Sequence, residues 1–232
     1  MHATVSLIRV DPVLIVPHDV DFRTGNIDFP GVVQVHGDVA PGFELKARDA
    51  IEIKGTVMGA TIGSEGDITI GAGFLADAEG YDGHIHSGGT VHVEGAGQIR
   101  GAQVIAGLDV RARTIGGRLG PRTVIVAGCR SSLADLELIL NNLPPPELLR
   151  QAGFSKATGL RDRVERRDAS NENTTDATAA NDDDSARPQV LVHEHIEPGT
   201  LITVGIHTLR PETRIHRCRI IEGQERLEVL PL

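Results

Sequence analysis

A degenerate repeat between about Asp19 and Gly128 constrains the fold of this chain more than any other feature. Short alternating apolar runs are separated by Gly/Asp turns that recur roughly every 18 to 23 residues. The turns are Gly37-Asp38, Arg48-Asp49, Gly66-Asp67, Gly88-Gly89 and Gly107-Leu108-Asp109. The runs after them include Ile51–Val57, Ile68–Ile70, Val91–Val93 and Val110–Ala112. A period of this length is typical of solenoids, in which each unit buries its apolar face by stacking on its neighbours.

Within one repeat, Ile51, Ile53 and Val57 share one side of the chain, whereas Glu52 and Lys54 take the other. A period of two predicts a strand with one buried face. A unit of strand, bend, strand and turn is one coil of a parallel β-helix. We therefore predict an all-β fold, a right-handed single-stranded parallel β-helix with a short helical and disordered insertion. We expect its interior to hold aliphatic stacks, among them Ile53, Ile70 and Val93.

The composition favours thin coils over a broad globular core. The chain has no Trp, one Tyr and five Phe, so its core must be built from Ile, Val, Leu and Ala. Of its 27 glycines, 22 lie at or before Gly128. Glycines at this density indicate turns that need positive φ, or places where backbones approach closely.

The pattern divides the chain into five segments. These are an initial strand or cap (1–18), the coils (19–130), a short helical insertion (131–154), a disordered acidic linker (155–188), and further coils or a cap of the same β-helix (189–232). Leu133, Leu136, Leu138, Ile139 and Leu140 form the apolar face of the predicted helix. The linker lacks the large apolar residues that ordering requires. Within the coils, 73–83 is longer than a turn and predicts a loop that bulges outward.

Charge and cysteine content exclude several classes of protein. The net charge of −9 argues against a general nucleic-acid binder or a protein of anionic membrane surfaces. Cys129 and Cys218 form neither a disulfide framework nor a metal motif, which favours reduced thiols in a cytoplasmic protein. The N-terminus has no signal-peptide pattern, and the aliphatic run Val13–Val16 is far shorter than the roughly 20 residues of a membrane helix. We therefore expect no membrane insertion.

Three stretches, Val20–Gly31, Val35–Ala47 and Ile51–Ala60, resemble the flagellar assembly protein A family, and Ile196–Gly205 is similar to its C-terminal Pro-Gly segment. The resemblance implies a polymer-like right-handed β-helix domain of unknown function. It also implies a bacterial cytoplasmic protein connected with flagellar assembly or placement. Against this family we expect a short variant without the family's N-terminal domain, in which a short helical stretch with an acidic linker replaces the long helical hairpin. The family offers no catalytic residues to transfer.

Histidines are the first candidates for chemistry. His84 and His86 have the spacing i, i+2, as do His193 and His195, which on a strand places both rings of a pair on one face. His92 and Glu94 repeat the pattern one coil later. Two rings on one face are the beginning of a metal site, but the sequence identifies no third ligand. We therefore predict a solvated face, with no metal and no cofactor.

Carboxylates and nucleophiles are the second candidates. The spacing of Asp49 and Asp67 allows them to stack in neighbouring coils, with Asp109 further along. Acidic residues are clustered in this way in β-helical polysaccharide lyases and hydrolases. Each lies at a turn, where Asp bonds to its own backbone, so we predict a structural role. Cys129 beside Arg130 is favoured as an apolar last-coil residue over a nucleophile. No Gly-x-Ser-x-Gly motif is present, and the glycine-rich run 59–64 matches no phosphate loop.

The basic residues Arg210, Arg214, Arg217 and Arg219 predict a solvated strand edge protected against pairing, in preference to a site for an acidic partner. Together these interpretations predict a non-enzymatic scaffold that presents flat sheets and turn ridges to protein partners, a second copy included. One alternative is a binding module like the β-helical domain of the septum-site cell-division inhibitor. Another is a carbohydrate-active β-helix enzyme. A cleft with two close carboxylates and a basic residue would favour the enzyme, and exposed apolar patches would favour the scaffold.

Overall fold

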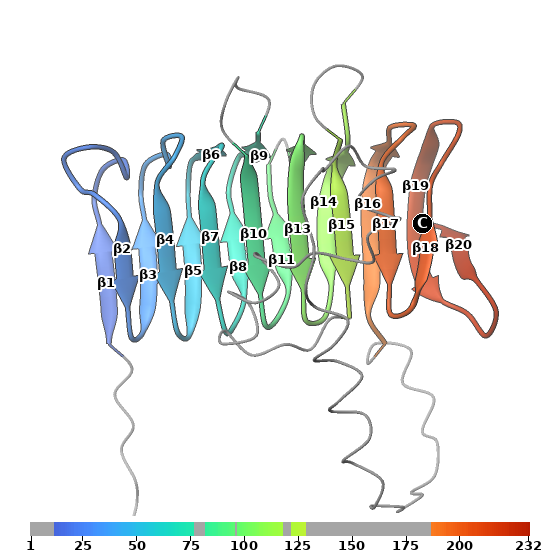
Figure 1. The fold of residues 1–232 in the computed structure, drawn as a ribbon, viewed down its shortest axis with the longest axis horizontal. Helices are drawn as coiled ribbons and strands as arrows, with labels where there is room; N and C mark the ends of the chain where they lie inside the picture. Colours follow the sequence, from blue (N-terminus) through green and yellow to red (C-terminus); the bar gives the residue numbers. More distant parts are fainter. Residues whose placement is uncertain (1–11, 77–81, 96, 118–121, 129–186) are drawn as a thin grey trace, which may run out of the picture.

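The computed structural model describes residues 12–76, 82–95, 97–117, 122–128 and 187–232. The regular secondary structure within these residues consists of β-strands alone. The coils stack in chain order along the long axis of the molecule (Figure 1). The parallel β-helix predicted from the repeat is therefore confirmed. The predicted helical insertion (131–154) and nearly all of the acidic linker (155–188) lie outside the described residues, as does Cys129.

The strands line up on three faces of the solenoid. The first face holds β1 (Val13–Val16), β3 (Val32–Val35), β5 (Ala50–Ile53), β8 (Ile68–Ile70), β11 (Val91–Val93), β14 (Val110–Ile115) and β16 (Gln189–Ile196). The second face holds β2 (Ile27–Phe29), β4 (Glu44–Ala47), β7 (Thr61–Ser64), β10 (Gly83–Ser87), β13 (Ala102–Ala106), β15 (Val124–Ala127) and β17 (Leu201–Val204). The third face holds the short strands β6 (Thr56–Met58), β9 (Gly73–Leu75) and β12 (Gln98–Arg100). The long strands β14 and β16 continue from the first face onto the third.

Parallel in-register pairing stacks like residues into inner columns. Ile53 pairs with Ile70, and Ile70 with Val93, and all three are almost fully buried, as predicted. On the second face, Ile62, Ile85, Val104, Ile125 and Ile202 form a column of the same kind. Each coil thus buries branched aliphatic side chains against the coils before and after it, and the core needs few aromatic rings.

The prediction of a bulging loop over 73–83 was wrong for its first part. Residues 73–75 form β9, and Phe74 is fully buried in the column between Val57 and Ile99. The loop begins only after this third-face strand, and its residues 77–81 lie outside the described part of the chain. The extra length of the coil therefore lies between its third and second faces.

The Gly/Asp turns connect one coil to the next. The Oδ1 atom of Asp38 accepts a 2.7 Å hydrogen bond from the backbone N–H of Thr56, and that of Asp67 accepts one of 2.7 Å from Thr90. A Cβ atom built on Gly89 would lie 2.2 Å from the Asp67 Oδ1 atom, which is too close for any side chain. The glycine is needed there because the carboxylate of the preceding coil fills that space. For Asp67, a bond to the next coil is found where a bond to its own turn was predicted.

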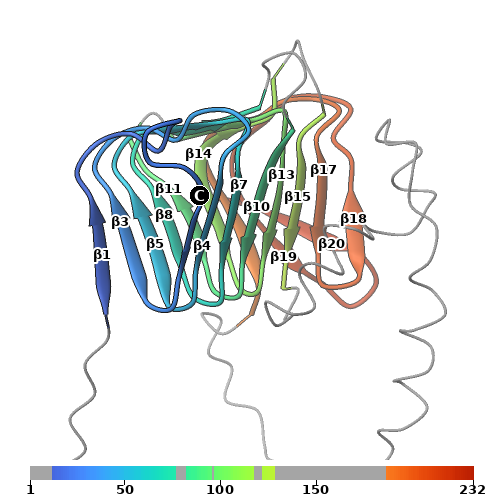
Figure 2. The same ribbon diagram turned by 60° about the vertical axis from the view of Figure 1, so that its left-hand side comes forward.

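After the insertion, the chain returns to the same solenoid. Strand β16 stacks in parallel on β14, and β17 stacks in parallel on β15, so residues 189–204 form the next coil. The chain then reverses direction. Strand β18 (His207–Leu209) pairs antiparallel with β17, β19 (Ile215–Glu222) with β16, and β20 (Leu227–Pro231) with β19 (Figure 2).

Candidate functional site

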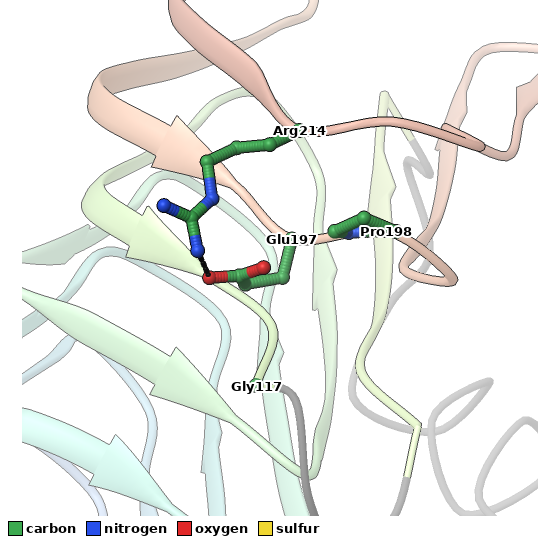
Figure 3. Close-up of a pocket in the computed structure, with 4 residues that line it drawn as sticks. All are labelled: Gly117, Glu197, Pro198 and Arg214. Carbon is green, nitrogen blue, oxygen red and sulfur yellow. Dashed lines mark hydrogen bonds and ion pairs between the residues drawn. The ribbon is translucent and has the colours of Figure 1, made fainter.

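A small cavity of about 290 Å³ opens at the corner where β16 ends, lined by Gly117, Glu197, Pro198 and Arg214 (Figure 3). Glu197 begins a tight turn with Pro198 and Gly199, and Gly199 has the positive φ of +83° that the third position of such a turn requires. The turn closes with a hydrogen bond of 2.8 Å from the Thr200 hydroxyl to the Glu197 carbonyl oxygen. This turn holds the Glu197 carboxylate at the mouth of the cavity.

The Glu197 carboxylate is already engaged by two partners. A guanidinium N–H of Arg214 donates a 2.5 Å hydrogen bond to Oε1, and the His195 Nε2 atom lies 3.3 Å from the same oxygen. Among the described residues that line this cavity, Glu197 is the single carboxylate. These residues therefore do not supply the pair of close carboxylates that would favour the carbohydrate-active alternative. The geometry suits a structural ion pair that fixes the last corner of the solenoid.

The structure divides the histidine candidates between different faces. His84 and His86 both point outward from β10 on the second face, because Ile85 between them points inward. His92 lies on β11 of the first face, where it pairs with Thr69 and Arg111. The three rings do not converge. Among the described residues, no group of three or more His, Cys, Asp or Glu side chains is placed to hold a metal ion.

The second histidine pair departs from strict alternation. A register shift between Val192 and His195 interrupts the pairing of β16 with both β14 and β19. His193 therefore has no register partner on either neighbouring strand, whereas His195 pairs with Thr114 and His216. His195 lies beside Glu197, with its ring centre 6.0 Å from that of His216. The spacing of the two histidines does not report this irregularity, because a bulge leaves no trace in an alternating sequence.

His86, on the second face, has a pKa that is strongly shifted from the ordinary value of a histidine. It is 1% exposed, and neither ring nitrogen has a hydrogen-bond partner. Burial disfavours its charged form and lowers its pKa to about 4, so the ring is neutral at pH 7. The predicted solvated face is therefore wrong at this position.

The turn aspartates have structural partners. Asp109 accepts hydrogen bonds from the backbone N–H and the side-chain amide of Gln189, at 3.2 and 3.1 Å, and pairs with Arg111. It thereby connects the coils on either side of the insertion. Asp67 bonds the next coil at Thr90, and Asp49 also has an interaction partner. The glycine-rich run 59–64 leads into β7 and contributes to the second face.

The cysteine and arginine candidates lie in the C-terminal closure. Cys218 is buried in β19, and burial raises the pKa of its thiol to about 11, which makes it a poor nucleophile. Arg210 and Arg214 precede β19, whereas Arg217 and Arg219 lie within it. Strand β19 itself lies between β16 and β20. The prediction of a protected outer edge was therefore wrong for Arg217 and Arg219. Arg214 is engaged with Glu197, and Arg219 has an interaction partner.

Comparison with known families adds to this geometry. Residues 12–96 match the family described as Flagellar Assembly Protein A beta solenoid domain, and the described coils of that span form a β-solenoid. No curated protein and no solved structure gives a significant match to the chain. The coils from β12 onward, which follow the matched span, extend the solenoid in the same register.

The exposed apolar side chains of the described solenoid gather at its two ends. At the first end, Val13 and Ile15 point outward from β1 and are 51% and 56% exposed, and Phe22 lies on the following turn. The last end exposes Ile206, Val229, Leu230 and Leu232. Between the ends, Met58 and Leu108 are the large apolar residues exposed within the described coils. The described part of the chain contains no helix with the length and hydrophobicity of a membrane-spanning segment.

Proposed function

We propose that this solenoid belongs to the Flagellar Assembly Protein A family, and that it is a non-enzymatic scaffold of a bacterial cytoplasm that serves flagellar assembly by binding protein partners through its ends. The observation that carries the proposal is the concentration of exposed apolar side chains at the first and last coils. Isolated exposed apolar residues are normal on a protein surface, but groups of them mark interaction sites. The family match supports the link to flagellar assembly.

The edges of the terminal strands strengthen the case for the ends. Within the described residues, β1 pairs with β3 alone, so the other edge of β1 presents backbone N–H and C=O groups. Such an edge accepts a further strand, and Val13 and Ile15 lie on it as apolar anchors. Binding by strand addition fits a partner with an extended apolar segment, and a second copy of this chain supplies one in β20.

The cavity at Glu197 supports the non-enzymatic side of the proposal. Its carboxylate and guanidinium neutralise each other, which leaves no free base or nucleophile among the residues that line it. The family is described as one of flagellar assembly and not as an enzyme family.

A charge placed on the first end tests the proposal. The double variant Val13→Lys/Ile15→Lys should lose partners that the unmodified chain captures from extract of its native cells, and should reduce swimming motility. The control Met58→Lys places the same charge on a residue that is 37% exposed between the ends, and should change neither readout. Light scattering of the purified chains separates a second copy from a foreign partner. Equal capture and motility in both variants would contradict a role for the first end.

A further inference from the structure

Strand β1 has a free edge at the first end of the solenoid (Figure 1). The carbonyl oxygens of Pro12 and Val16 each accept a 2.9 Å hydrogen bond from the next coil. Backbone groups alternate in direction along a strand, so Leu14 also faces that coil, whereas the N–H and C=O groups of Val13 and Ile15 face the other edge. Within the described part of the chain no strand lies along this edge. It therefore offers two donors and two acceptors.

The same short strand leaves apolar side chains uncovered on both of its sides. Val13 and Ile15 are about half exposed on the outer side of the solenoid. Leu14, between them, points inward and packs against the core, yet it is only partly buried because Val33 covers it from one direction alone. Unpaired backbone groups and exposed apolar side chains on one strand are what the addition of a further strand requires.

We propose that the added strand is β1 of a second copy, paired antiparallel about a two-fold axis through Leu14, so that the first ends of two solenoids join. This inference rests on the proposed use of the ends as binding surfaces and names the partner of one of them. In this register Val13 of each copy lies opposite Ile15 of the other, and the two pairs exchange four backbone hydrogen bonds. The two Leu14 side chains meet on the inner side. Such a contact is isologous, because each copy contributes the same strand.

A proline fixes the register and the length of this contact. By the same alternation Pro17 falls on the free edge directly after β1, but it has no N–H to donate. A shift of two residues that sets Pro17 opposite Val13 therefore loses a bond from each of those pairs. A shift of one residue sets outward side chains opposite inward ones. The proline also keeps the ladder short, so we expect a reversible dimer and no extended aggregate.

Strand β20 of a second copy suits the same edge less well. It runs antiparallel to β19, which runs antiparallel to β16, so β20 is parallel to the other strands of the first face. The parallel register that continues the inner column sets Leu14 on Val229 and thereby sets the apolar Val13 opposite Glu228. Pro231 then faces the added strand without a donor, since the neighbouring Leu232 directs its N–H to β19. We therefore favour the pairing of β1 with β1.

A single cysteine on the two-fold axis tests the contact in the full-length chain. In a Cys129→Ser background, where the remaining Cys218 is buried, Leu14→Cys should form a disulfide-linked dimer under mild oxidation. The two thiols would face each other in a non-hydrogen-bonded pair, whose Cα atoms lie about 4.5 Å apart, within the range of a disulfide. The control Met58→Cys lies at an exposed position between the ends and should cross-link far more slowly. Equal rates, or no cross-link at position 14, would overturn the proposal.

Sedimentation of the purified full-length chain tests the backbone pairing. The chain should show a monomer–dimer equilibrium with no larger species. Ile15→Ala keeps the edge N–H, whereas Ile15→Pro removes that donor twice in each dimer and should weaken the dimer by a further 5- to 150-fold, roughly. Leu230→Lys changes the exposed side of β20 and should leave the equilibrium unchanged. Equal weakening by the two Ile15 variants, or loss of association in Leu230→Lys, would overturn the pairing of β1 with β1.

The same measurement separates this inference from the proposed function. A purified chain that stays monomeric at every concentration, while Val13→Lys/Ile15→Lys still loses its partners from cell extract, would overturn the dimer and leave the first end as a binding site for a different protein. A dimer that Val13→Lys/Ile15→Lys abolishes would support the inference, whatever the extract shows.

Discussion

The first and last ends of the solenoid begin from the same alternating pattern and finish differently. At the first end, β1 runs parallel to β3, and Val13 and Ile15 are half exposed on it. At the last end, β18, β19 and β20 turn back antiparallel, and Cys218, Ile220 and Ile221 become buried. The last end therefore closes its core with its own chain. The contrast shows that closure depends on reversal of the chain, since apolar alternation is common to both ends.

The largest expected difference between the ends lies in one inner column. Leu14 pairs with Val33 at the first end of this column, whereas Ile220 lies between Val190 and Val229 near its last end. Ile220 is fully buried, so Ile220→Ala should lower the free energy of unfolding by about 2–5 kcal/mol. Leu14 is only partly buried, so Leu14→Ala should cost about 1 kcal/mol. Urea unfolding measures both, and equal losses would show that the two ends are equally closed.

A smaller difference is expected for the turn aspartates. Asp109 is buried and bonds Gln189 twice, so Asp109→Ala should cost about 1–3 kcal/mol by leaving buried donors unpaired. At the first end, Asp19 accepts one exposed hydrogen bond of 2.8 Å from the Asp38 N–H, and Asp19→Ala should cost about 0.5–1 kcal/mol. The same unfolding experiment measures both. A greater loss for Asp19→Ala would reverse the proposed ranking of the two ends.

The smallest expected difference between the ends lies in how fast a thiol reagent labels a cysteine there. It leaves the free energy of unfolding nearly unchanged. Val16 pairs with Val35 at the first end of the solenoid, whereas Cys218 lies between Val192 and Pro231 at the last end. Burial raises the pKa of the Cys218 thiol to about 11, so little thiolate forms at pH 8 and labelling by a thiol reagent should be slow. A cysteine at the first end, Val16→Cys in a Cys129→Ser/Cys218→Ser background, should react faster. Equal rates would indicate that the first end is covered as well as the last.

The sequence was sufficient for the parts of the fold that depend on the repeat. Ile53, Ile70 and Val93 could be placed inside because a period of two assigns each residue of a strand to one face. Phe74 could not, because a strand of three residues is too short to show alternation. Its position becomes visible only when the coil is aligned with Val57 and Ile99 in its neighbours.

The candidate site was less accessible from the sequence. Alternation reads the same in parallel and antiparallel strands, so the reversal after Val204 was not predicted. The pairing of Glu197 with Arg214 depends on that reversal, which brings residues 17 positions apart into contact. The burial of His86 depends on what lies over the second face, which the spacing of His84 and His86 does not report.

The hydrogen bonds that Asp109 accepts from Gln189 join residues 80 positions apart, whereas the bond that Asp38 accepts from Thr56 spans 18. The early coils can therefore form one after another through short loops, while the last coil must wait for the whole insertion to be synthesised. During that interval, β14 and β15 end the growing solenoid with unpaired edges. A nascent chain from a neighbouring ribosome meets these edges at the stage when they are most receptive. The time needed to translate the insertion thus sets how long each new molecule is open to pairing with the wrong chain.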